Sequence, residues 1–153
     1  MVFQLKDIRN YSPELGLFPK TVGDQYSLED LSRLYRLMKN ENCLYVGDMM
    51  FLYSLTDRPN PWPVIHLHDG TSYNSRDSVS YAESRSMLVK NLVKYKTALL
   101  IQDILVWGPE PFVQFTYQLK GKMRQRIGNL IVYEIDKEKL VWMASNLNII
   151  LDK

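Results

Sequence analysis

Apolar residues recur at helical spacing in the first well-patterned part of the chain. Over residues 28–38 the intervals of three and four positions place five large apolar side chains on one face of a helix. Ser27 can cap this helix, with Asp30 at its third position, close to a capping box. Asp48 is likewise placed to cap a short, almost wholly apolar helix that follows it, so this second helix is expected to be buried.

Three later segments also predict helices. Ser80 and Glu83 form a capping box that opens a helix to about residue 95. Pro111 suits the first turn of a helix that runs to about residue 119. The last amphipathic segment, 140–147, predicts a helix near the end of the chain.

Short apolar runs between these helices predict buried strands, at residues 43–46, 64–67, 98–102 and 129–135. Strands that are apolar throughout and separated by helices are typical of a mostly parallel sheet covered on both faces. The sequence therefore predicts an α/β fold: a three-layer, Rossmann-like sandwich with a mostly parallel sheet of about four to five strands. Residues 1–25, rich in proline and glycine, predict an irregular N-terminal arm, and residues 26–153 a single domain.

Charge and cysteine content exclude several classes of protein. The net charge is +2, so bulk charge does not favour nucleic acid as a partner. Cys43 is the only cysteine, which excludes an internal disulfide and a cysteine-based zinc cage, and its apolar surroundings favour a core residue over a reactive thiol. No apolar run is long enough to predict a transmembrane helix, and the first residues lack the pattern expected of a signal peptide. No glycine-rich phosphate motif favours a nucleotide, so no cofactor is predicted.

His66, His68 and Asp69 form the densest group of candidate ligands. On a strand, His66 and His68 would point to the same face, and imidazoles at that spacing can share one metal ion with Asp69 as a third ligand. The alternative is that they finish an exposed strand end and bond the loop after it. With no third histidine in the chain, the second interpretation is favoured and the metal site is kept as an alternative.

Ligands of open parallel sheets bind beyond the carboxyl ends of the strands. The sequence places carboxylates there after three predicted strands, at Asp48, Asp69 and Asp103, and the neighbouring loops add Arg58 and Tyr73. We therefore expect a polar rim that binds a ligand, formed by Asp48, Arg58, His66, His68, Asp69 and Tyr73. No residue is assigned a catalytic role.

The stretch KGKMRQR carries a cation at every second position: Lys120, Lys122, Arg124 and Arg126. If extended, it would present four cations on one face, suited to phosphate groups of lipids or another polyanion. The alternative, which we favour, is a solvated edge strand whose cations prevent edge-to-edge pairing.

Two stretches, VGDMMFLYSLTDRPNPWPVIHLHDGTSY and RIGNLIVYEI, suggest a family relationship. The segment between residues 28 and 135 resembles the soluble C-terminal domain of polytopic membrane glycosyltransferases of the GT-C class, which use dolichyl- or polyprenyl-phosphate sugars. The likeness lies in a strand ending in Gly-Asp, a helix with Leu-Tyr, an Arg-Pro turn, and a closing Gly-x-x-x-Val-Tyr strand. In those enzymes the catalytic acids lie in the membrane portion, so none can be transferred to this chain.

The resemblance implies a non-catalytic accessory domain on the extracytoplasmic face of a membrane. Its expected partners are the transmembrane portion of the same polypeptide and a glycan or polyprenyl-phosphate sugar that it helps to position. The chain begins at Met1 and has no membrane span, which implies an excised domain or an independent relative. Two alternatives stay open: a small metal-assisted hydrolase that uses His66, His68 and Asp69, and an anion-binding or protein-interaction module.

Overall fold

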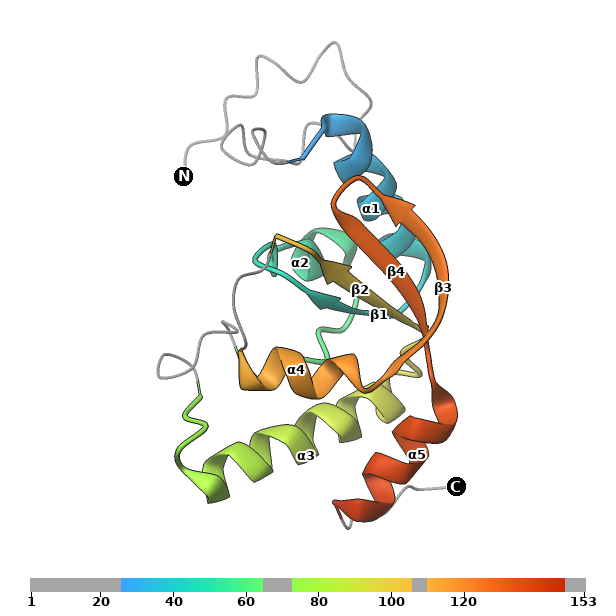
Figure 1. The fold of residues 1–153 in the computed structure, drawn as a ribbon. Helices are drawn as coiled ribbons and strands as arrows, with labels where there is room; N and C mark the ends of the chain where they lie inside the picture. Colours follow the sequence, from blue (N-terminus) through green and yellow to red (C-terminus); the bar gives the residue numbers. More distant parts are fainter. Residues whose placement is uncertain (1–25, 65–72, 106–109, 148–153) are drawn as a thin grey trace.

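The computed structural model describes residues 26–64, 73–105 and 110–147 (Figure 1). Within these ranges the chain forms five helices and four strands. In chain order they are α1 (Leu28–Asn40), β1 (Cys43–Val46), α2 (Leu52–Thr56), α3 (Ser78–Lys94), β2 (Leu99–Asp103), α4 (Pro111–Tyr117), β3 (Lys120–Ile127), β4 (Leu130–Ile135) and α5 (Lys137–Asn146). The mixed α/β class predicted from the sequence is confirmed. The predicted arm at 1–25 lies outside the described residues, as does nearly all of the predicted strand at 64–67.

The four strands form one sheet in the order β1-β2-β4-β3. β1 and β2 run parallel, whereas β2 pairs with β4 and β4 pairs with β3 in antiparallel orientation. The prediction of a mostly parallel sheet is therefore wrong, and the Rossmann-like three-layer sandwich is not confirmed. The physical reason is that KGKMRQR is strand β3, joined to β4 by a tight turn at Gly128-Asn129, so β4 enters the sheet from a hairpin.

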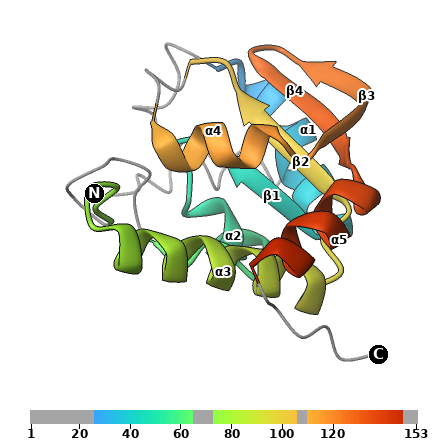
Figure 2. The same cartoon turned by 60° about the horizontal axis from the view of Figure 1, so that its bottom comes forward.

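Helices pack against both faces of the sheet (Figure 2). Figure 2 shows α3, α4 and α5 toward the viewer and α1 behind the sheet. The buried apolar residues of the described segments form one cluster, to which β1 and β2 contribute their fully buried Leu44, Tyr45, Leu100 and Ile101. This burial on both sides of β1 and β2 explains why their sequences lack alternation.

The ends of the helices test the predicted caps. Ser27 accepts a hydrogen bond from the backbone N–H of Asp30, which confirms the predicted cap of α1. Asp48 does not cap α2, which begins at Leu52 after Phe51 without a side-chain cap. α3 begins three residues earlier than predicted, because its cap is Asp77, which accepts from the N–H groups of Val79 and Ser80, and not Ser80. Pro111 opens α4 as predicted.

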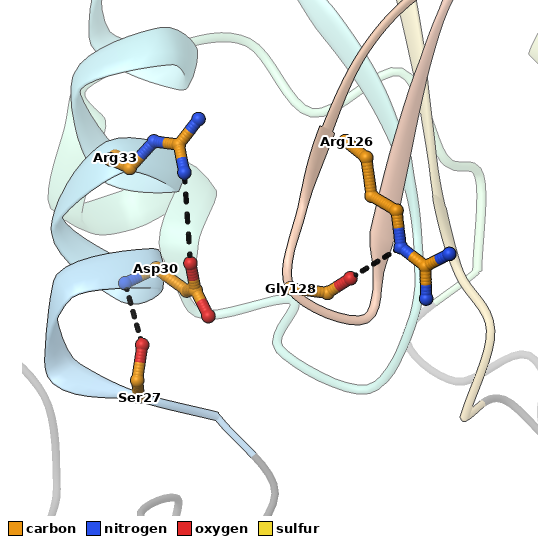
Figure 3. Close-up of polar contacts among 5 residues, drawn as sticks. All are labelled: Ser27, Asp30, Arg33, Arg126 and Gly128. Atoms are coloured by element: carbon orange, nitrogen blue, oxygen red, sulfur yellow. Dashed lines mark hydrogen bonds and ion pairs between the residues drawn. The ribbon is translucent and has the colours of Figure 1, made fainter.

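The β3–β4 hairpin turns beside the first turn of α1 (Figure 3). Gly128 has φ of +55°, and a Cβ atom there would lie 2.4 Å from Oδ2 of Asp30. Nε of Arg126 donates to the carbonyl oxygen of Gly128 at 2.8 Å (Figure 3). On α1, Nη1 of Arg33 lies 3.9 Å from Oδ1 of Asp30. The glycine thus supplies both the left-handed turn and the close approach of the hairpin to α1.

Candidate functional site

A buried carboxylate lies where β1 and β2 end. Asp103, the last residue of β2, is only 1% exposed. Its Oδ2 accepts hydrogen bonds from the hydroxyls of Tyr26 and Tyr45, the latter at 3.3 Å, and its Oδ1 accepts from the N–H of Leu105 at 2.9 Å. The predicted gathering of polar groups at this edge is therefore present for Asp103, but the two tyrosines that complete it come from distant parts of the chain.

The protonation of this cluster reflects its burial. Burial raises the pKa of Asp103, and the nearby charge of Asp48 adds to the rise, while the hydrogen bonds from Tyr26, Leu105 and Tyr45 oppose it. Burial also raises the pKa of Tyr26 and of Tyr45, and their interaction with Asp103 raises both further. Both phenols therefore remain protonated near neutral pH and act as hydrogen-bond donors to a carboxylate that water scarcely reaches.

The outer edge of β1 is closed by side chains from the segment after it. The hydroxyl of Tyr53 donates to the carbonyl of Cys43 at 3.1 Å and accepts from the N–H of Tyr45 at 2.7 Å. The indole of Trp62 donates to the carbonyl of Tyr45 at 2.7 Å. These bonds satisfy backbone groups that a further strand would otherwise use, so Tyr53 and Trp62 replace a neighbouring strand.

Cys43 lies within this closed edge and is 2% exposed. Burial raises the pKa of its thiol to about 12, because the thiolate would lose its hydration. The residue is therefore a protonated core thiol, as its sequence context indicated.

Arg58, predicted to bind a ligand, joins α1 to the loop after α2. Its guanidinium donates from Nε to the carbonyl of Lys39 at 2.8 Å and from Nη1 to Oδ1 of Asn42 at 3.4 Å. It thereby satisfies a carbonyl at the C-terminal end of α1 that has no partner within the helix. Arg58 also borders a shallow surface hollow of about 380 Å³ between α2 and the proline-rich loop.

Tyr73 lies in an aromatic cluster and is 6% exposed. Its ring stacks on Tyr81 with centroids 5.7 Å apart and meets the fully buried Phe112 edge-on at 5.2 Å. Its hydroxyl donates to Glu110 at 3.2 Å and accepts from the N–H of Phe112 at 3.4 Å. Arg85 stacks over the ring of Tyr81 at 4.8 Å. Tyr73 thus anchors the start of α4 to α3 through ring packing and two hydrogen bonds of its hydroxyl.

Of the predicted polar rim, only part can be placed. Asp48 is exposed and Arg58 half-buried, while Tyr73 belongs to the aromatic cluster. His66, His68 and Asp69 lie outside the described residues, so their metal site stays a prediction. Within the described ranges no three histidine, cysteine or acidic side chains are placed to hold a metal ion.

The four cations of KGKMRQR do not share one face of β3. Register shifts lie between Lys120 and Met123 and between Met123 and Gln125, and these break the alternation that a regular strand would have. Arg124 pairs with Glu41 at the end of α1 at 2.8 Å, on the side of the sheet where α1 lies. Lys120 lies on the other side, where Gln102 accepts its hydrogen bond and the ring of Tyr117 lies 3.7 Å from its Nζ. As expected, the segment is an edge strand.

α1 and β3 border a shallow groove of about 290 Å³. Arg33 and Arg36 line it from α1, whereas Gln125 and Ile127 line it from β3. Asp30 and Glu41 pair with Arg33 and Arg124, so part of this positive charge is balanced within the chain.

Comparison with protein families, with curated proteins and with solved structures finds no match to this chain. Among the described helices, none combines the length and apolar content needed to cross a bilayer.

Proposed function

We propose that the chain is a non-catalytic accessory domain of a membrane-bound glycosyltransferase, held on the extracytoplasmic face of the membrane. The support for the family is the resemblance over residues 28–135, a range that runs from α1 to β4. Its Gly-Asp motif follows β1, its Leu-Tyr motif lies in α2, and its closing motif spans the β3–β4 turn and β4.

The observation that supports a non-catalytic role is how this segment uses its polar side chains. Arg58 satisfies the end of α1, Tyr53 closes the edge of β1, and Tyr73 is buried against Phe112. The presence of each of these groups is explained by its role in the fold, without a catalytic role. The domain would serve its enzyme by positioning an acceptor or a lipid-linked sugar beside the transmembrane portion.

The 153-residue chain is accordingly expected to give no sugar transfer when incubated with a labelled polyprenyl-phosphate sugar and an acceptor, because the catalytic acids belong to another part of the enzyme. Binding of the sugar lipid, followed by backbone amide shifts in NMR spectra, is expected to be weak and to affect residues around Asp48 and Arg58. Measurable transfer would refute the non-catalytic role. Spectra unchanged by the sugar lipid would refute the positioning role.

A second function is favoured by one observation: β3 is an edge strand on which Lys122, Arg124 and Arg126 are all exposed. Such a strand suits the anion-binding or protein-interaction module considered from the sequence. Arg33 and Arg36 of α1 line the groove between α1 and β3, and they extend the positive surface beyond β3. This function is compatible with the first, since an accessory domain at a membrane meets phosphate groups.

A further inference from the structure

The two edges of the sheet are finished differently. At β1 the side chains of Tyr53 and Trp62 bond the outer backbone groups and close the edge. β3 forms the opposite edge and pairs on its outer side with no other described strand (Figure 1). In the described part of the chain, the one side-chain bond to the backbone of β3 runs from Lys139 to the carbonyl of Lys120, at the start of the strand. The rest of the β3 edge is therefore open.

The backbone groups of Arg126 point outward from this open edge. The N–H of Ile104 donates to the carbonyl of Asn129 at 3.0 Å, in the antiparallel register of β2 and β4. Because bonding directions alternate along an antiparallel strand, Leu130 turns its backbone groups toward β3, where Ile127 is its partner. Arg126, the neighbour of Ile127, therefore directs its N–H and carbonyl away from the sheet. Backbone groups of this kind are a template for a further strand.

The groove between α1 and β3 lies beside the same part of the strand. Gln125 and Ile127 line it from β3, and Arg33 and Arg36 line it from α1. The side chain of Arg33 is 45% exposed, and its Nη1 lies 3.9 Å from Oδ1 of Asp30 (Figure 3). So exposed and long an ion pair contributes little, which leaves the guanidinium able to turn to a carboxylate of a partner.

We propose that the open edge of β3 binds an extended acidic segment of another protein, which adds a further strand to the sheet. Bonds to the outward backbone groups would provide affinity, and carboxylates at alternate positions would face Arg33 and Arg36 across the groove. The exposed cations Lys122 and Arg126 also favour an acidic strand. They disfavour a second copy of this chain, because like charges would then face one another. This inference rests on the anion-binding or protein-interaction function proposed for β3 and adds the partner.

The test uses a short, fluorescently labelled peptide of alternating valine and glutamate, with binding followed by fluorescence anisotropy. We expect saturable binding that weakens with salt, and slower hydrogen exchange of the Arg126 amide in the complex. The same peptide with lysine in place of glutamate should not bind. A form with N-methylated backbone amides keeps every charge, and it should bind about fivefold more weakly, the effect of losing one hydrogen bond.

Matched variants of the chain separate hydrogen bonding from charge. Arg126→Pro removes the outward N–H without removing a bond to β4, whereas Arg126→Ala removes the same cation and keeps the N–H. The proline variant should bind the acidic peptide about fivefold more weakly than the alanine variant. Arg33→Glu should weaken binding about fivefold, because a repulsion replaces an attraction. Lys90→Glu, the same charge change at an exposed position of α3 on the other side of the sheet, should have little effect (Figure 2).

Binding to heparin, a soluble polyanion, distinguishes this inference from the function on which it rests. Heparin binding without peptide binding, or equal binding of the acidic peptide and its N-methylated form, overturns the added strand and leaves the anion-binding function standing. Absence of binding to both overturns both. Self-association that Arg126→Pro abolishes and the peptide does not displace would assign the edge to a second copy, and it would also overturn the inference. Circular dichroism verifies the fold of each variant, and if Arg126→Pro does not fold, the N-methylated peptide measures the same bonds from the side of the partner.

Discussion

Replacing Asp103 by alanine is expected to lower the free energy of unfolding by about 3 kcal/mol. The change removes the acceptor shared by Tyr26, Tyr45 and the N–H of Leu105. Tyr45 is fully buried, so its hydroxyl would lose its acceptor without gaining water. Urea unfolding followed by circular dichroism measures the loss.

The control for this prediction is Asp48→Ala. Asp48 is an exposed carboxylate close enough to raise the pKa of Asp103, and its removal should change stability by no more than about 0.5 kcal/mol. Equal losses for Asp103→Ala and Asp48→Ala would show that the buried network does not stabilise the fold.

The same site predicts a pH dependence. Because burial raises the pKa of Asp103 above its value in the unfolded chain, the folded state binds this proton more tightly. The contribution of Asp103 to stability is then fully present below the unfolded pKa and falls as pH rises through the folded pKa. Asp103→Asn removes this titration, so wild type should lose stability relative to the variant as pH rises across that window.

Gly47→Ala is expected to destabilise the fold by about 2–3 kcal/mol, for lack of space beside Tyr45. A Cβ atom at this position would lie 2.2 Å from the hydroxyl oxygen of Tyr45 and 2.4 Å from Cζ of the same ring. The ring cannot move aside, because it is fully buried and its hydroxyl is held by Asp103. Thermal and urea unfolding measure the effect.

A double-mutant cycle identifies the cause. Tyr45→Leu removes the ring atoms that the new methyl group would meet, so Gly47→Ala should cost at least about 1 kcal/mol less in that background than in wild type. An equal cost in both backgrounds would show that contact with the ring of Tyr45 is not the cause of the lost stability. Gly47 belongs to the Gly-Asp motif of the family resemblance, so this cycle also tests whether the motif serves the fold.

Local signals in the sequence predicted individual elements well. Ser27 and Pro111 mark the starts of α1 and α4, because their effects depend only on the next few residues. At α3 the same reasoning selected Ser80 and did not consider Asp77, three residues earlier, which is an equally good cap. Such local signals did not determine the order of the strands in the sheet.

The error in the sheet has a specific origin. Gly128-Asn129 between two β-forming runs is a recognisable hairpin signal, and recognising it would have predicted an antiparallel β3–β4 pair. The buried site was less accessible to sequence analysis. Asp103 and Asp48 were placed at one edge from the pattern alone, but Tyr26 is 77 positions from Asp103 and no local feature connects them.

The proposal that this chain is an accessory domain of a membrane enzyme is tested most directly by an immunoblot of membranes from its source organism, with an antibody against the 153-residue chain. The account predicts a polypeptide larger than 18.0 kDa that stays in the membrane after extraction with alkaline carbonate, since it would carry its transmembrane portion. An 18.0-kDa polypeptide that carbonate releases, or that is found only in the soluble fraction, would contradict the account.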